Sequence, residues 1–195
     1  MSAYALDEAQ QRVLGCLVEK QRTTRDQYPL SLNALRLACN QTTSRDPVLS
    51  LDESEVRAAV QRLGQIGFAR LASGPGSRAA KYRHLLDEAL GLDGAETAVL
   101  AVLLLRGPQT ASELKARAER LGDVGDALAV LERLARRELV EVQPRQPGRR
   151  EERWAHLLGG GGAGHAPAST LEERLRTIEE RLGELERTLA ERGLL

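Results

Sequence analysis

One arrangement, three amphipathic helices followed by a pair of short strands, is predicted twice along this chain. This internal repeat restricts the possible folds more than any other feature of the sequence. Its first copy begins at Leu6-Asp7 and its second at Leu92-Asp93. The first copy is longer because it has an extended loop around residues 40 to 50. A repeat of this length indicates duplication of a whole domain rather than of a solenoid unit.

In the first copy, apolar spacing and turn residues predict three helices and two strands, over residues 7–21, 31–40, 50–66, 68–72 and 79–84. Asp7 and Ser31 are typical N-caps. The third helix begins at Asp52, or at Ser50 in a capping box with Glu53. The buried faces of the second and third helices are expected at Leu32, Leu35, Leu37 and Ala38, and at Val56, Val60, Leu63 and Ile66.

The second copy has the same signals in the same order. Asp93 with Glu96, and Thr110 with Glu113, form predicted capping pairs for its first two helices. Its third helix is marked by Val124, Leu128, Leu131 and Ala135, and its strands by residues 139–143 and 152–157. Three helices followed by a hairpin is the order of a winged helix. We therefore expect a mainly α fold with small β-hairpins (α+β), with winged-helix domains at 1–88 and 89–158.

The rest of the chain predicts a linker and a coiled coil. Residues 159–168 are rich in glycine and are expected to be flexible. Residues 169–195 carry apolar side chains at heptad positions a and d, namely Leu175, Leu182 and Leu189, and Leu171, Ile178 and Leu185. In this register arginines at g face glutamates at e only in a parallel pair. We expect a parallel homodimer, with one amphipathic helix packed on its own chain as the alternative.

Composition favours a binding protein over an enzyme. The 28 lysines and arginines balance the 28 aspartates and glutamates, so local patches rather than net charge must attract any nucleic acid. His84, His156 and His165 are scattered, and Cys16 and Cys39 fit buried small apolar residues. The sequence therefore predicts no catalytic residues, metal or cofactor. Without a signal peptide or an apolar span, we expect a cytoplasmic protein with no membrane partner.

Long polar side chains opposite the apolar face of a third helix, and cations in the wing, are typical of winged helices that bind duplex DNA. Acidic residues at the start of each third helix oppose this interpretation, and ion pairs on a solvated face are the alternative role for the arginines. The candidates are Arg57, Gln61, Arg62, Gln65, Arg78 and Lys81 in the first copy, and Arg133, Arg137, Arg145, Arg149 and Arg150 in the second.

Several longer runs of residues resemble a known family. They are YPLSLN at 28–33, ACNQTT with RDPV at 38–48, LLRGPQT with EL at 104–114, and PGRRE at 147–151. These runs are similar to those of the YceH-like family of bacterial proteins. The resemblance implies a tandem winged-helix fold, often with a coiled-coil tail, and transfers no catalytic or ligand-binding residue. The polar loop at 39–47 is either functional or hydrogen bonded to itself.

Two functions remain open at this point. In the first, the chain is a DNA-binding, transcription-regulator-like protein whose weak contacts add up in the dimer. In the second, it is a protein-interaction scaffold that uses its helix faces to bind partner chains, as tandem winged-helix subunits of chromosome condensation complexes do. Zero net charge favours the scaffold.

Overall fold

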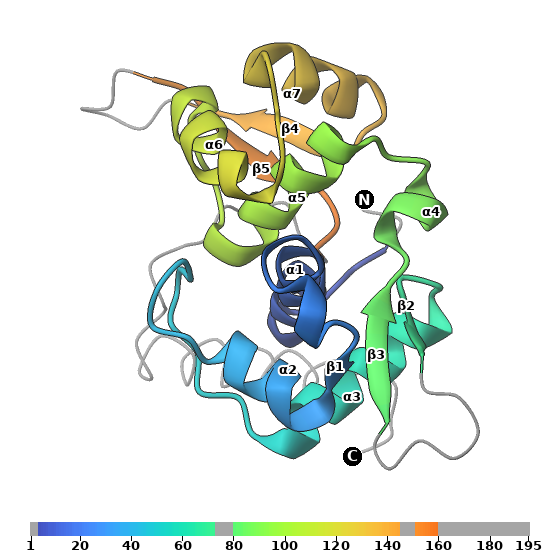
Figure 1. Ribbon diagram of the computed structural model, residues 1–195. Coiled ribbons are helices and arrows are strands. Elements are labelled where there is room, and N and C mark those ends of the chain that lie inside the picture. The colour runs from blue at the N-terminus through green and yellow to red at the C-terminus, as the bar shows by residue number, and fades with distance from the viewer. Residues whose placement is uncertain (1–3, 73–79, 145–150, 160–195) are drawn as a thin grey trace, which may run out of the picture. The chain divides into compact units, whose positions relative to one another are not determined.

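The computed structural model describes residues 4–72, 80–144 and 151–159, which fall within the unit Met1–Gly164 (Figure 1). The predicted linker and coiled coil lie outside the described residues, as do most of the two hairpin turns. In the described part the fold is mainly helical with small antiparallel strand pairs, which confirms the α+β class. The division into two domains at residue 88 stays a prediction.

The elements of the first half are α1 (Glu8–Thr23), the 3-10 turn η1 (Arg25–Gln27), β1 (Leu30–Ser31), α2 (Leu32–Cys39), α3 (Glu53–Gln65), β2 (Ala69–Leu71) and β3 (Lys81–His84). A short helix that the sequence did not predict, α4 (Leu86–Leu90), leads into the second half. That half contains α5 (Gly94–Arg106), α6 (Ala111–Ala118), the 3-10 turn η2 (Glu119–Leu121), α7 (Ala127–Arg136), β4 (Val140–Gln143) and β5 (Arg153–His156).

Most helix starts agree with the predicted caps, but α3 begins at Asp52 and not at Ser50. The carboxylate of Asp52 accepts a hydrogen bond from the backbone N–H of Glu55 at 2.9 Å, and Glu55 accepts one from the Asp52 N–H at 2.7 Å. The helix cannot begin earlier because the Asn40 side chain binds both the N–H and the C=O of Leu51, each at 2.8 Å. This clamp places the end of α2 beside the start of α3.

The strand pairs repeat between the two halves. In the first sheet the order is β1-β3-β2, with Leu30 opposite Tyr82. In the second, β4 pairs with β5, and Gln109 forms an isolated antiparallel bridge with Trp154 of β5. In both halves, therefore, the residues just before the second helix pair with the last strand. The repeat in the sequence is also a repeat of structure.

For two apolar residues the predicted burial is wrong. Leu37 on α2 is 57% exposed and Leu128 on α7 is 46% exposed. The core face of α7 contains Ala127, Val130, Leu131 and Leu134, which follow one another at helical spacing and leave Leu128 on the other side. A single position along a helix turns a side chain by about 100°, so a small error in register exposes an apolar residue.

Helix α1 joins the two halves. It lies between α5 on one side and α2 and α3 on the other (Figure 1). Gly15 of α1 faces Leu104 and Leu105 of α5, where an added Cβ would come within 2.8 Å of the Leu105 side chain. Helix α5 is buried on all sides from Glu96 to Leu105, as its continuous apolar sequence requires. The core of the described residues is therefore shared by both halves.

Candidate nucleic-acid interface

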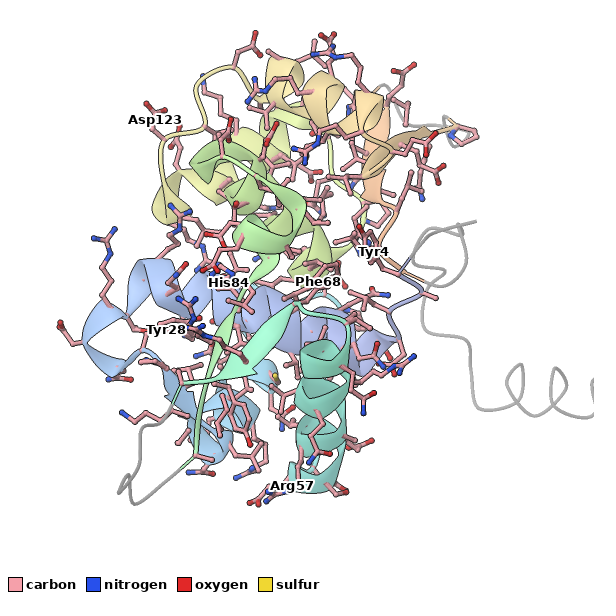
Figure 2. The ribbon with its side chains drawn as sticks, turned by 90° about the vertical axis from the view of Figure 1, so that its right-hand side faces the viewer. Tyr4, Tyr28, Arg57, Phe68, His84 and Asp123 are labelled. Carbon is pink, nitrogen blue, oxygen red and sulfur yellow. The ribbon has the colours of Figure 1, made fainter. Side chains whose placement is uncertain are left out.

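The outward face of α3 carries the side chains that the sequence assigned to nucleic-acid contacts. Arg57, Gln61, Arg62 and Gln65 are all exposed, while the opposite face of the helix is packed into the core. Figure 2 shows Arg57 near the end of α3 that lies away from α1. Lys81 on β3 is also exposed. These five side chains, called the α3 surface below, are accessible to a large ligand.

The polar contacts on this surface are weak. Arg57 forms an ion pair with Glu53 one turn earlier, 2.6 Å between Nη2 and Oε1, and both side chains are more than half exposed. Arg62 donates a hydrogen bond to the side-chain oxygen of Gln65 at 3.0 Å. Exposed pairs of this kind contribute about 0–1 kcal/mol, so a phosphate group can replace them at low cost.

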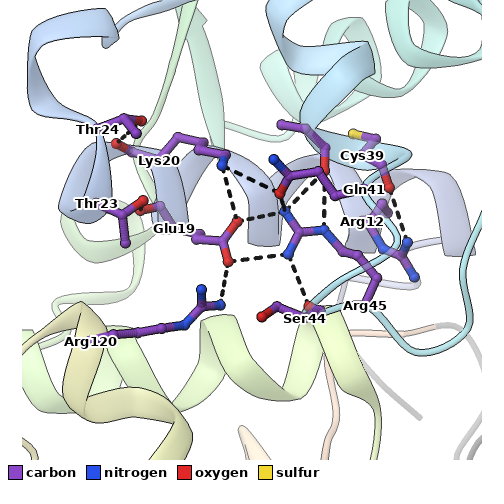
Figure 3. Close-up of polar contacts among 11 residues, drawn as sticks. Arg12, Glu19, Lys20, Thr23, Thr24, Cys39, Gln41, Ser44, Arg45 and Arg120 are labelled. Carbon is purple, nitrogen blue, oxygen red and sulfur yellow. Dashed lines mark hydrogen bonds and ion pairs between the residues drawn. The ribbon is translucent and has the colours of Figure 1, made fainter.

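A buried ion pair positions the loop that leads to α3 (Figure 3). Arg45 in this loop binds both carboxylate oxygens of Glu19 on α1, at 3.1 and 2.5 Å. Arg45 also donates from Nε to the carbonyl of Ala38 at 3.1 Å, near the end of α2. Because both charged side chains are removed from water, loss of either one would leave the other as an uncompensated buried charge.

Glu19 is also bonded to the second half. Arg120 of η2 donates to its Oε1, and Lys20 lies 4.0 Å from its Oε2. Burial opposes ionisation of Glu19, but the hydrogen bond from Arg45 and the positive charges of Arg45, Arg120 and Lys20 outweigh it. The pKa of Glu19 therefore lies below that of a free glutamate. The charged cluster holds α1, the loop and η2 together.

The polar loop at 39–47 is largely hydrogen bonded to the protein itself. The Gln41 side chain accepts from Arg45 at 3.1 Å and from Lys20 at 3.4 Å. Arg12 of α1 donates to the carbonyls of Cys39 and Pro47, at 3.1 and 2.5 Å. These contacts favour a structural role for the loop.

Sequence reasoning missed both Arg12 and Glu19. A signal was present, because the two residues are seven positions apart and so lie on one face of α1, the face that also carries Cys16. Cys16 and Cys39 are buried and reduced, as expected. The interaction with Cys16, together with burial, raises the pKa of Cys39, and its thiol stays protonated.

In the second half, the arginines of the third helix bind the protein itself. Arg133 lies 3.0 Å from the carboxylate of Asp93 and 3.3 Å from that of Glu96. Arg137 lies 3.3 Å from Glu96 and donates to the carbonyls of Leu90 and Gly91. Both guanidinium groups thus cover the capped start of α5. Their ion-pair partners, Asp93 and Glu96, are distant from them in the sequence.

The remaining candidates lie outside the described residues: Arg78, Arg145, Arg149 and Arg150 of the predicted wings, and Leu171, Leu175, Ile178, Leu182, Leu185 and Leu189 of the predicted coiled coil. Of the predicted DNA-binding residues, the described part therefore presents one exposed group, the α3 surface, and one group bonded to α5.

Known proteins share this sequence over most of its length. The UPF0502 protein of Dechloromonas aromatica is 47% identical over 174 residues, which are 83% of this chain and 81% of that protein. The UPF0502 protein of Stenotrophomonas maltophilia is 44% identical over 204 residues, 95% of this chain and 93% of that protein. The family model described as "Protein of unknown function, DUF480" matches residues 6–149. The chain belongs to the UPF0502 (DUF480) family.

Membership in UPF0502 confirms the resemblance to a family of bacterial proteins that the sequence runs indicated. The family description names no activity, so the site must be interpreted from its own chemistry. Among the described residues of this UPF0502 chain, no helix is long and apolar enough to cross a membrane. The same residues contain no cluster of three histidine, cysteine or acidic side chains suited to a metal ion.

Proposed function

We propose that this UPF0502 chain is a DNA-binding, transcription-regulator-like protein with two winged-helix halves. The observation that carries the proposal is the α3 surface, where two arginines and two glutamines are exposed on the helix that would enter the major groove. Arginine and glutamine are the side chains that most often read guanine and adenine. Lys81 on the adjoining hairpin supplies a further cation for phosphate contacts.

The first half is the main contact in this proposal. Arg133 and Arg137 of the second half are held by Asp93 and Glu96 and would have to break those bonds to reach a phosphate. The exposed face of α7 carries Glu132 beside Arg136 and has no glutamine, whereas α3 exposes two. The second half therefore acts as support for the first, through the packing of α1 on α5.

Pairing through residues 169–195 completes the proposal. A parallel dimer brings two α3 surfaces to one DNA molecule, so that two weak contacts act together at high effective concentration. We expect a variant truncated after residue 168 to have the mass of a monomer in light scattering. An unchanged oligomeric mass would exclude the coiled coil as the means of pairing. A role on the chromosome also requires that the protein is cytoplasmic.

The DNA proposal is tested by fluorescence anisotropy of the full chain with duplex DNA at several salt concentrations. Changing Arg62 and Lys81 together to glutamate should weaken binding by about tenfold or more at low salt, because both cationic contacts with the DNA are lost. Each lost phosphate contact should also reduce the dependence of log affinity on log salt concentration by about one unit. The matched control changes Lys115 and Arg136, exposed in the second half, to glutamate. The control has the same net charge.

We expect the control to retain most of the affinity. An equal loss of affinity in the two double variants would mean that overall charge alone attracts the DNA. If the full chain binds no duplex at low salt, the proposal is wrong.

A second candidate function is a protein-interaction scaffold. It is favoured by apolar side chains on the surface of the second half, where Leu128 of α7 is 46% exposed and Val142 of β4 is 42% exposed. Changing both to serine should then abolish capture of a partner protein from the native cell while DNA binding stays unchanged. If DNA binding falls instead, the two residues belong to the DNA surface.

A further inference from the structure

A cavity of about 420 Å³ opens beside the end of α1. It is lined by Gln21, Arg22, Arg25, Tyr28 and Asp87, which come from α1, η1, the segment after η1, and α4. Its volume falls within the range of about 300–1,000 Å³ that is usual for small-molecule sites. None of these residues belongs to the α3 surface, and so the cavity is a separate feature of the protein.

Among the residues that the structure describes, no anionic side chain pairs with either arginine of the cavity. Within the described residues, the side chains of Arg22 and Arg25 form no hydrogen bond or ion pair, although Arg22 is half-buried. The half-buried arginines of the strands differ, since Arg83 lies 2.7 Å from Glu88 and Arg153 lies 3.1 Å from Glu113. A partly desolvated guanidinium without a carboxylate is a favourable place for an anion.

Tyr28 adds a hydrogen-bond donor to the cavity. Its hydroxyl oxygen accepts from the backbone N–H of His84 at 2.8 Å, and Figure 2 shows the two residues close together. Burial raises the pKa of Tyr28 to about 12, so the hydroxyl keeps its proton and can donate it to a ligand. The position of this hydroxyl is fixed by the end of β3.

Asp87 gives the cavity one acidic group. Its carboxylate lies 3.5 Å from Nδ1 of His84, whose Nε2 is held by the Gln21 side chain at 2.6 Å. Burial lowers the pKa of His84 to about 4, so the imidazole is neutral near pH 7 and adds no charge. Two guanidinium groups and one carboxylate leave the lining with one net positive charge.

We infer that this cavity binds a small carboxylate that also carries an ammonium or hydroxyl group, as amino acids and hydroxy acids do. The carboxylate of the ligand lies between Arg22 and Arg25, and its ammonium or hydroxyl donates to Asp87. A phosphate dianion fits less well because the single net positive charge does not balance it and Asp87 repels it. The Arg22 guanidinium also lies near Gly94 and Gly122, so a bound ligand sits where the first half meets the second.

Isothermal titration of the full chain tests this assignment. The probes are the twenty common amino acids, lactate, malate, acetate and inorganic phosphate. We expect at least one amino or hydroxy acid to bind with a Kd of about 1 mM or lower, and to bind more tightly than acetate and phosphate. If no probe binds, or if phosphate binds most tightly, the assignment is wrong.

Three variants test whether the ligand binds in the cavity or elsewhere on the surface. Arg22→Gln and Arg25→Gln should each weaken binding about tenfold or more, because each removes a charge-assisted hydrogen bond. Asp87→Asn should weaken binding of the amino or hydroxy acid but not of acetate. The control is Arg36→Gln on α2, a half-buried arginine that bonds only to Asn33 among the described side chains.

Folding of each variant is checked by circular dichroism. If Arg22→Gln unfolds the chain, Arg25→Gln still tests the assignment, because Arg25 is exposed and its replacement should not disturb the fold. In NMR spectra the ligand should shift the amide signal of His84, which is bonded to Tyr28. Equal effects of Arg36→Gln and Arg25→Gln, or an unshifted His84 amide on binding, would place the ligand elsewhere and overturn the assignment.

Discussion

Glu19 and Arg45 form a two-point ion pair in the interior, with side chains that are 2% and 0% exposed. The pair links α1 to the loop that precedes α3, and Arg120 extends it to the second half. The loop that leads to α3 is thus held in place by a buried ion pair.

Glu19→Gln should lower the free energy of unfolding by about 3–5 kcal/mol, because Arg45 is then left as a buried charge without a counter-charge. Urea denaturation followed by circular dichroism measures the loss. Arg57→Gln is the control, since it removes only the exposed pair with Glu53 and should cost less than about 1 kcal/mol. Similar losses in the two variants would contradict the structural role of the buried pair.

Stability should fall as the pH drops from about 6.5 toward 4, partly because of His84. Its folded pKa of about 4 lies below the value of about 6.5 in an unfolded chain, so the unfolded state binds the proton first. The contribution is fully present above pH 6.5 and is lost through this window, about 3 kcal/mol in total. His84→Gln should flatten the dependence, and an NMR titration should show His84 ionising near pH 4. A titration near 6.5 would refute this.

Arg133→Gln and Arg137→Gln should each lower the free energy of unfolding by about 1 kcal/mol and leave DNA affinity nearly unchanged. The reason is that both arginines cover Asp93 and Glu96 at the start of α5. Thermal unfolding and anisotropy, run in parallel, separate stability from binding. If their DNA affinity falls as much as that of the double variant at Arg62 and Lys81, Arg133 and Arg137 contact DNA after all.

Gly15→Ala should destabilise the chain by about 1–3 kcal/mol, because the new Cβ would lie 2.8 Å from Leu105 in the contact between α1 and α5. Gly64→Ala is the matched control. It lies in the exposed part of α3, where an added Cβ meets only the Ala69 carbonyl at 3.8 Å. Alanine there should stabilise the helix by up to about 1 kcal/mol. Chemical denaturation decides, and a neutral Gly15→Ala would show that the two helices do not pack closely.

The sequence was most informative where the signal is local. The caps Asp7, Ser31, Asp93 and Thr110 were all predicted, because a capping side chain and the N–H groups it binds lie within three residues of each other. Errors arose where the neighbours are distant. Strand β1 has only two residues and exists because β3 pairs with it, and such a short segment has no periodic pattern.

The candidate sites divide in the same way. The sequence predicted which side of α3 faces outward, since one helix period separates Arg57 and Gln61 from Val56 and Val60. It could not predict that Arg133 binds Glu96, or that Arg22 and Asp87 line one cavity, because those residues are distant in the chain.

By itself, then, the sequence determined the repeated order of helices and hairpins, the main caps and the polar face of α3. These follow from contacts between residues a few positions apart, whose energies do not depend on the rest of the fold. Only the tertiary structure decided which charges are buried, which arginines are already paired, and that Arg22 and Arg25 line one cavity without a partner among the described side chains. Those outcomes depend on how α1 packs against α5. They therefore depend on contacts between segments that the chain brings together only when it folds.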